Sequence, residues 1–268
     1  MKLSILIPTY KYDPSQLVSQ LQKQLPEDAE IIVGDDSPPH NLGRAARRNA
    51  LAREAKGEWL LFIDSDAEVR STTFIKDYLE ASKQALVVCG GTGNLPQCPR
   101  PEARLRYDYE VKAEKRLTLS HRKAHPYAQF TTFNFLIQRE LFLSILFDET
   151  LKEYGHEDTL FGLELKKRNI PILHIDNKLT HLGLEDADEY LQKTETALRS
   201  LASMSEEQKQ NVRVSALALR LKGWYLLGVV RFLYRICKPL LRANLLGKHP
   251  SQLLFASYKL GYYANQEL

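Results

Sequence analysis

Short apolar runs alternate with amphipathic segments through the first third of the chain. Continuous apolar stretches rich in branched side chains predict buried strands at 3–7, 30–34, 58–63 and 85–89. Apolar positions at helical spacing between them predict helices at 14–25, 44–56 and 72–83. This order is typical of an α/β fold with a doubly wound, mainly parallel, Rossmann-like sheet and right-handed crossovers.

The pattern is less regular after residue 95. Three prolines interrupt the chain, and we then expect a charged helix at 102–116, a strand at 131–137, helices at 139–146 and 157–168, and a strand at 170–175. From about residue 186 the spacing is helical, with a break near 203–206. We therefore predict an α/β domain over residues 1–204 and a basic helical extension over residues 205–268.

The composition is ordinary for a soluble globular protein, with 44% apolar and 26% charged residues among 268. Cys89, Cys98 and Cys237 form no disulfide framework and no zinc-binding spacing, which favours a reducing compartment. The first apolar run is too short for a signal peptide, and no uncharged apolar stretch approaches the roughly 18 residues that span a bilayer. We expect a cytoplasmic protein.

Positive charge is concentrated near the end of the chain. Ten Lys and Arg, and no Asp or Glu, lie between Lys209 and Lys259, which suggests an acidic partner, either anionic lipid or nucleic acid. Four of these cations fall on one side of a predicted helix, which Pro239 should kink or break: Arg231, Arg235, Lys238 and Arg242. Such a basic amphipathic helix suits an anionic membrane, and the alternative is a helical hairpin that packs on the rest of the chain and leaves its arginines solvated.

Three consecutive predicted strands end in polar or acidic side chains. Pro8 and Thr9 end the first, Asp35 and Asp36 follow the second, and Asp64-Ser65-Asp66 follows the third. In an open parallel sheet these ends meet at one edge, where ligands bind. A divalent cation held there by one or two carboxylates keeps positions open for substrate phosphates. For Asp-x-Asp alone, a polar turn after a core strand is the simpler alternative.

The usual nucleotide motifs are missing from the sequence. Gly90-Gly91-Thr92-Gly93 does not have the GxGxxG spacing, and no GxxxxGK[ST] occurs. Arg44, Arg47 and Arg48 share one face of the helix after the second strand, where they could bind a diphosphate or simply face solvent.

Together, these segments resemble family-2 glycosyltransferases with the GT-A fold, of the type that builds bacterial cell-surface polysaccharides. The resemblance covers roughly residues 1–200 and rests on 4–10, 33–37, 48–49, 57–66, Gly155-His156-Glu157-Asp158 and His181. It implies that Asp36 of the Asp35-Asp36 pair binds the nucleotide base, that Pro8 and Thr9 line the base pocket, and that Arg48 lies near the ribose or phosphates.

The resemblance also implies a Mn²⁺ or Mg²⁺ site. Asp66 would bind the cation directly, Asp64, beside Ser65, would contact the ribose or a metal-bound water, and His181 would be a third ligand. Imidazole suits manganese better than magnesium. Asn134 falls where relatives contact sugar or acceptor, although Thr131-Thr132-Phe133 replaces the glycine pair that is frequent before that strand.

Glu157 and Asp158 resemble the catalytic acidic pair of the family. An inverting transfer needs a carboxylate that takes the proton of the acceptor hydroxyl, opposite the leaving diphosphate. Asp158 matches this base, and Glu157 would orient the acceptor or the base. Taken by itself, Asp158 is also a good N-cap for a helix that begins at Thr159.

We therefore expect an inverting, metal-dependent glycosyltransferase. The donor would be a nucleotide-diphospho-sugar, with UDP favoured, and the acceptor a glycan or a lipid-linked molecule at the inner face of the plasma membrane. A nucleotidyltransferase is the first alternative, but it predicts a glycine- and lysine-rich loop where the chain has Pro8-Thr9-Tyr10-Lys11-Tyr12. A non-catalytic module that binds membrane or nucleic acid is the second, and it gives no reason for carboxylates along a sheet edge. We expect no nucleic-acid partner.

Overall fold

The computed structural model describes residues 2–38, 42–150 and 155–266. Contacts between residues divide the chain into two compact units. The first comprises Met1–Leu95, Glu114–Lys152 and Glu157–Gly183, and the second comprises Pro96–Ala113, Glu153–His156 and Leu184–Leu268. This division differs from the boundary at residue 204, because residues 184–204 belong with the C-terminal helices.

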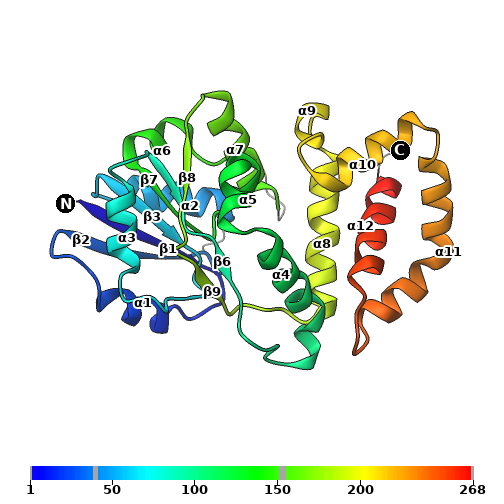
Figure 1. Cartoon of the computed structure of the whole chain (residues 1–268), viewed down its shortest axis with the longest axis horizontal. Helices are drawn as coiled ribbons and strands as arrows, with labels where there is room; N and C mark the ends of the chain where they lie inside the picture. Colours follow the sequence, from blue (N-terminus) through cyan, green and yellow to red (C-terminus); the bar gives the residue numbers. More distant parts are fainter. Residues whose placement is uncertain (1, 39–41, 151–154, 267–268) are drawn as a thin grey trace. The chain divides into compact units, whose positions relative to one another are not determined.

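A six-stranded sheet forms the centre of the first unit (Figure 1). Its order is β2-β1-β3-β7-β5-β8, with bounds Ala29–Asp35, Leu3–Thr9, Trp59–Ile63, Asn134–Gln138, Val87–Cys89 and Ile172–His174. Only β7 runs antiparallel to its neighbours in this sheet, and the other pairs are parallel. The predicted mainly parallel α/β fold is confirmed.

Helices cover both faces of this sheet because the strands are apolar on both sides. Along β1, Ile5 and Ile7 pack with α1 (Ser15–Gln22) and α3 (Phe74–Ala81). Leu6 points to the other face and packs with α2 (Arg44–Glu54), α6 (Arg139–Ile145) and α7 (Glu157–Lys167). That face is rich in aromatic rings, and Phe62 stacks on Phe135 with ring centroids 4.8 Å apart. Two separate cores thus hold the carboxyl ends of the parallel strands in fixed positions.

A second, three-stranded sheet and two short helices are absent from the sequence prediction. The sheet has the order β4-β9-β6, with bounds Ala67–Glu68, Leu179–His181 and Thr92–Gly93. A strand of two or three residues contains too few positions to show a periodic pattern. The helix α5 (Leu119–Ala124) and the 3-10 turn at Tyr127–Gln129 are equally short. The small sheet matters because β9 carries His181.

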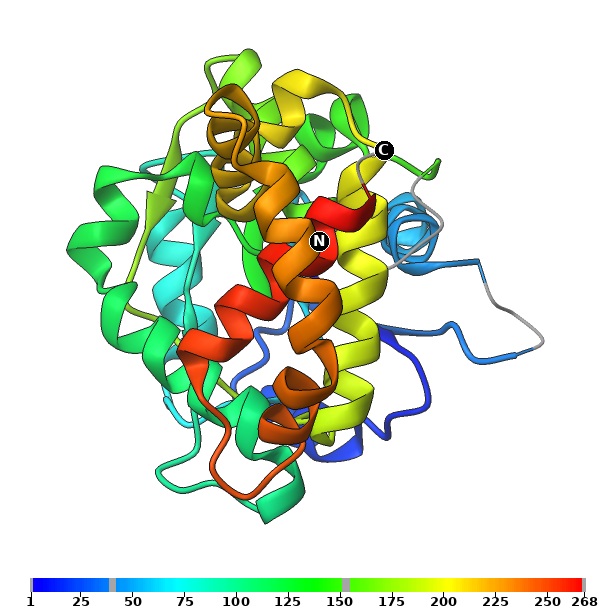
Figure 2. The same cartoon turned by 90° about the vertical axis from the view of Figure 1, so that its right-hand side faces the viewer.

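The second unit consists of helices. After Pro101–Ala103 and most of α4 (Arg104–Arg116) it contains α8, α9, α10, α11 and α12, at Ala187–Ala202, Glu206–Lys209, Arg213–Gly223, Leu227–Leu245 and Gln252–Gln266. Helix α12 packs against α8, α10 and α11, and Figure 2 shows α11 and α12 side by side. Pro239 lies inside α11, so of the predicted kink or break the break is wrong, and the kink stays a prediction. Within the described ranges, no helix is long and apolar enough to cross a membrane.

Candidate active site

The carboxyl ends of β1, β2 and β3 lie at one edge of the large sheet, as the pattern of polar strand ends predicts. Strand β1 pairs in parallel with both neighbours, and Thr9 lies opposite Asp35. The Asp36 N–H donates to the Thr9 carbonyl at 2.8 Å. Thr9 is 7% exposed and its hydroxyl donates to the Tyr12 carbonyl at 2.5 Å. Pro8, just before it, is partly exposed.

The two carboxylates after β2 are placed differently. Asp36 is buried, and its oxygens accept hydrogen bonds from the N–H groups of Leu42 and Gly43 at 2.7 and 3.0 Å. Asp35 is exposed and accepts from the Ser37 N–H at 2.9 Å. Asp36 therefore stabilises the segment that leads into α2, and Asp35 is the more accessible carboxylate of the pair.

Arg48 and Asp64 form an ion pair at the end of β3. Arg48 Nη2 lies 2.5 Å from Asp64 Oδ1, and Arg48 is only 4% exposed. Burial and the nearby Asp66 carboxylate raise the pKa of Asp64, whereas Arg48 and Arg44 lower it. Among the described residues nothing accepts a hydrogen bond from the buried Nε of Arg48. A buried donor of this kind suits an anionic ligand such as a phosphate.

Asp66 lies against His181, which comes from a distant part of the sequence. His181 Nε2 is 3.1 Å from Asp66 Oδ2, and antiparallel pairing of β4 with β9 puts Ala67 opposite His181. His181 is 6% exposed and its ring packs edge-on to Phe133. The Leu182 N–H also donates to the Asp66 carbonyl at 2.8 Å. The small sheet therefore fixes both side chains.

Gly183 is a site residue that the sequence did not identify. A Cβ added at this position would lie 2.0 Å from Asp66 Oδ2 and 2.7 Å from its Cγ. Any larger residue would displace the Asp66 carboxylate. The sequence does show a glycine two positions after His181, but a single glycine in a loop is too common to predict a site residue.

The cation site that the resemblance implies is assembled in part. Asp66 and His181 lie together and could offer an oxygen and a nitrogen ligand, whereas Asp64 is engaged with Arg48. Within residues 2–38, 42–150 and 155–266, no group of three or more His, Cys, Asp or Glu is placed to hold a metal. Two protein ligands fit a cation that completes its coordination with substrate phosphates and water. The expected contact of Asp64 with the ribose or a metal-bound water stays a prediction, and Ser65 beside it is buried.

Asn134 is completely buried, so in this structure it offers no surface to a sugar. Its Oδ1 accepts from the Tyr78 hydroxyl, and its Nδ2 donates to the Gly91 carbonyl at 2.6 Å. Arg122, also buried, approaches Gly91 from another side: its Nη2 donates to the Ile175 carbonyl at 2.9 Å, and a Cβ at Gly91 would lie 2.9 Å from its Cζ. These polar groups hold the segment that follows β5.

Glu157 and Asp158 occupy the first turn of α7, which begins at Glu157. Asp158 Oδ1 accepts a hydrogen bond from the Thr159 N–H at 2.7 Å. Asp158 is thus inside the helix rather than at its N-cap, and the capping alternative as stated is wrong. The helix dipole favours acidic side chains in this turn.

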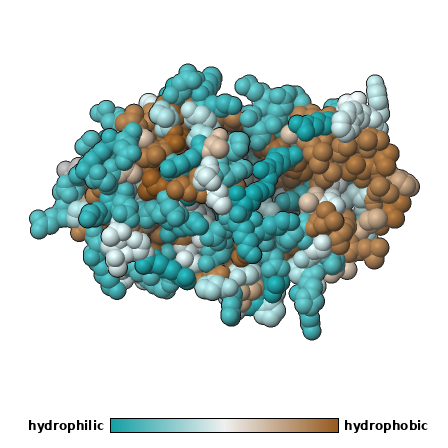
Figure 3. All heavy atoms as spheres, in the orientation of Figure 1, coloured by the Kyte–Doolittle hydropathy of each residue, from teal (hydrophilic) through white to brown (hydrophobic). Residues whose placement is uncertain are grey.

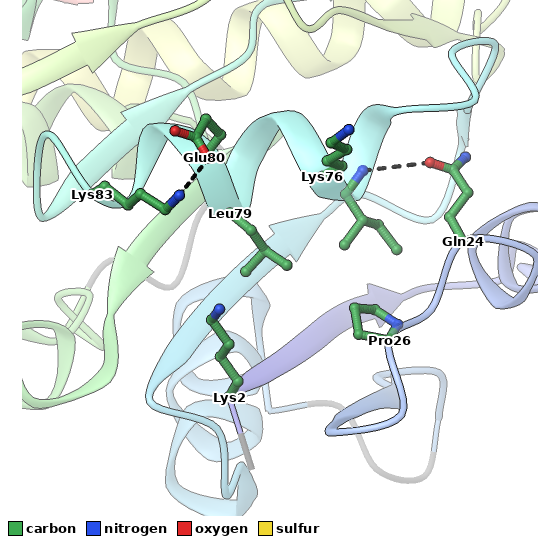
Figure 4. A pocket seen from close by; sticks show the side chains of 8 residues that line it. Lys2, Gln24, Pro26, Lys76, Leu79, Glu80 and Lys83 are labelled. Atoms are coloured by element: carbon green, nitrogen blue, oxygen red, sulfur yellow. Dashed lines mark hydrogen bonds and ion pairs between the residues drawn. The ribbon is translucent and has the colours of Figure 1, made fainter.

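A separate cavity of about 280 Å³ lies near the amino end of β1 (Figure 4). Lys2, Gln24 and Pro26 line one side, and residues of α3 line the other, where Glu80 pairs with Lys83 at 2.6 Å. None of the predicted site residues lines it. The strand ends that carry the carboxylates are at the opposite end of β1.

Comparisons with known proteins agree with this geometry. Residues 37–146 match the model of "Glycosyl transferase family 2", a range that includes Asp64, Asp66 and Asn134 but ends before Asp158 and His181. The chain is 25% identical over 234 residues to the uncharacterized glycosyltransferase EpsJ of Bacillus subtilis, covering 71% of this chain and 67% of EpsJ. It is 33% identical over 85 residues to an uncharacterized glycosyltransferase of Haemophilus influenzae, covering 24% of this chain and 29% of that one.

Solved structures show the same fold. The mannosyltransferase PcManGT of Pyrobaculum calidifontis, in complex with GDP-Man and Mn²⁺, has a TM-score of 0.59 at 14% identity, covering 99% of this chain and 85% of that chain. Residues 1–349 of S. aureus TarS, in complex with UDP-GlcNAc, have a TM-score of 0.51 at 17% identity, covering 100% of this chain and 90% of that chain.

Proposed function

We propose that the chain is an inverting, metal-dependent glycosyltransferase, which the match of residues 37–146 to glycosyl transferase family 2 and the GT-A fold support. It transfers a sugar from a nucleotide-diphospho-sugar, with UDP favoured as the nucleotide. The acceptor is a glycan or a lipid-linked molecule in the synthesis of a cell-surface polysaccharide.

The observation that carries the proposal is the pair of contacts on either side of Ser65. Asp64 binds the buried Arg48 at 2.5 Å, and Asp66 lies 3.1 Å from His181. Asp66 and His181 would hold Mn²⁺ or Mg²⁺, and the bound ion supplies positive charge that stabilises the leaving nucleotide diphosphate. Imidazole among the ligands favours manganese. Arg48 and Arg44, which both act on Asp64, add positive charge from the protein.

The remaining residues bind the donor and move the proton. Pro8, Thr9 and the Asp35-Asp36 pair stand at the ends of β1 and β2, where the base would lie. Asp158 takes the proton of the acceptor hydroxyl as that oxygen attacks the anomeric carbon, and Glu157 orients the acceptor. Both lie in the first turn of α7, where the helix dipole favours acidic side chains, and this placement supports the assignment.

The ligands of structural relatives support a nucleotide-sugar donor. TarS is in complex with UDP-GlcNAc, and PcManGT is in complex with GDP-Man and Mn²⁺. A lipid-linked acceptor would bring the enzyme to the cytoplasmic face of the plasma membrane as a peripheral protein.

Calorimetric titration with UDP and with GDP, in Mn²⁺ and in EDTA, tests the cation and the nucleotide. UDP should bind in Mn²⁺, and Asp66→Ala should abolish this cation-dependent binding because the bridge to the diphosphate is lost. Glu68→Gln is the matched control, since Glu68 lies on β4 beside the site but pairs with Arg70 at 2.7 Å. Unchanged UDP affinity in Asp66→Ala would refute the metal assignment.

A further inference from the structure

Helix α11 turns its charged side toward the other helices of the second unit. Arg231 Nε donates to the Ala264 carbonyl at 2.6 Å, and Arg235 Nε donates to Asn265 Oδ1 at 2.9 Å, so both bind α12. Two of the four cations of the predicted basic stripe therefore form hydrogen bonds within the protein.

Two further contacts fix this orientation of α11. Arg242 pairs with Asp188 of α8 at 2.8 Å. The Tyr234 ring lies directly on Gly261 of α12, where an added Cβ would be 2.4 Å from the ring. Arg231, Arg235 and Arg242 are therefore bound to α8 and α12 and not merely solvated.

The opposite side of α11 is apolar and exposed. Five side chains at i, i+3, i+4, i+7 and i+11 form what we term the outer stripe: Val229, Phe232, Leu233, Ile236 and Leu240, which are 52%, 63%, 53%, 60% and 75% exposed. Just before the helix, Trp224 is 67% and Tyr225 is 92% exposed. Figure 3 shows hydrophobic side chains gathered over α11. A contiguous apolar surface of this kind, unlike a single exposed leucine, marks an interaction site.

Exposed lysines lie before and after α11 in the sequence. Lys222 precedes α11 and Lys248 follows it; both are exposed, and in the described part of the chain neither forms an ion pair. No acidic residue occurs between Lys209 and Lys259 to offset them. The segment around α11 thus combines an exposed apolar side with positive charge at both ends of the helix.

We propose that the outer stripe docks on an anionic lipid bilayer. The five apolar side chains enter the boundary between headgroups and acyl chains, Trp224 and Tyr225 lie at headgroup level, and the lysines meet lipid phosphates. A second copy of the chain fits less well, because it would bring the same positive charges into the contact. The proposal rests on the lipid-linked acceptor of the proposed function, and it assigns membrane contact to the apolar side of α11 instead of its arginines.

Flotation of the whole chain with phosphatidylcholine vesicles, with and without phosphatidylglycerol, tests the proposal. The wild type should float with anionic vesicles, and the triple variant Phe232→Gln, Ile236→Gln, Leu240→Gln should bind at least about 100-fold more weakly because it loses apolar burial. Leu86→Gln, at an exposed leucine of the first unit, should float as the wild type does. Lys222→Gln with Lys248→Gln should weaken binding mainly at low salt, where charge attraction is least screened.

Tryptophan fluorescence gives a second readout. Trp59 is already buried at 7% exposure, so a blue shift on adding anionic vesicles must come from Trp224, and Trp224→Phe should remove it. Equal flotation of the wild type and the triple variant, or a wild type that ignores anionic vesicles even at low salt, would overturn the proposal. A dimer that the triple variant converts to a monomer would also overturn it, in favour of self-association.

Nucleotide binding measured on the same samples separates this proposal from the proposed function. Lost flotation with retained Mn²⁺-dependent UDP binding supports docking by the outer stripe. If the wild type binds no nucleotide but still floats through the stripe, the transferase proposal fails and the docking surface stands.

Discussion

Replacing Gly183 by alanine should weaken cation-dependent donor binding without changing any ligand. The added Cβ would lie 2.0 Å from Asp66 Oδ2, 2.7 Å from Cγ and 2.8 Å from Cβ. An ordinary contact of about 3.5 Å requires the carboxylate oxygen to move by roughly 1.5 Å. Gly183 does not have a positive φ, so the cost comes from this contact rather than from the backbone.

The displaced carboxylate cannot keep its 3.1 Å contact with His181. Because the Asp66 side chain is 28% exposed, it has room to rotate toward solvent, and the loss of stability should stay within about 1–3 kcal/mol. Disturbing the orientation of a metal ligand usually costs about 10–100-fold in metal affinity. We expect a fall of that size in Mn²⁺-dependent UDP affinity by calorimetry.

Gly93→Ala provides a matched control within the same small sheet. Gly93 lies on β6, and an added Cβ would meet nothing closer than 3.7 Å, an ordinary contact. This variant should bind Mn²⁺ and UDP as the wild type does. If Gly183→Ala also keeps wild-type affinity while its melting temperature is unchanged, Asp66 does not hold the cation in the position inferred here.

Three other variants address the base, the buried amide and a buried imidazole. Asp158→Asn should leave UDP affinity unchanged and lower turnover by about 10²–10⁴-fold, and wild-type turnover would exclude a general base at this position. Asn134→Ala should lower the free energy of unfolding in urea by about 2–3 kcal/mol, because the Gly91 carbonyl and the Tyr78 hydroxyl lose a buried partner; a neutral result would contradict that role. Burial lowers the pKa of His174, so the unfolded chain takes up a proton at higher pH than the folded one, and stability should decrease as pH falls below about 6.5. His174→Gln should reduce that slope between pH 7.5 and 5, and an unaltered slope would assign it to other groups.

The strand ends were predictable because an uninterrupted apolar run leaves little doubt about where a buried strand stops. The run before Asp64 becomes β3, which is buried throughout. The partner of Asp66 was harder to place, since β9 has three residues and pairs with a strand of two. Such a strand forms because its neighbours are already in position, so no local pattern predicts it. The role of His181 was therefore predicted from the family resemblance and not from the sequence pattern around it.

Asn134 and the arginines of α11 show a different limit. Spacing identifies which residues share a side of an element, but not whether that side meets solvent or protein. Asn134 begins a strand next to the expected site, yet Tyr78 and Gly91 satisfy its amide in the interior. Arg231 and Arg235 share a side as predicted, but the polar groups that receive them belong to α12, about 30 residues later.

The orientation of α11 follows from which of its sides finds hydrogen-bond partners in the rest of the second unit. Arg231 and Arg235 face α12 and donate to a carbonyl and an amide oxygen there. The Tyr234 ring packs on the same helix at Gly261, where the lack of a side chain leaves room for it. With these contacts made, the apolar side has no protein surface to cover it within the described residues and remains exposed. Leaving five large apolar side chains in water is costly, and burial in a lipid interface removes that cost. The helix is therefore better suited to a membrane by its apolar residues than by the basic stripe that first suggests one.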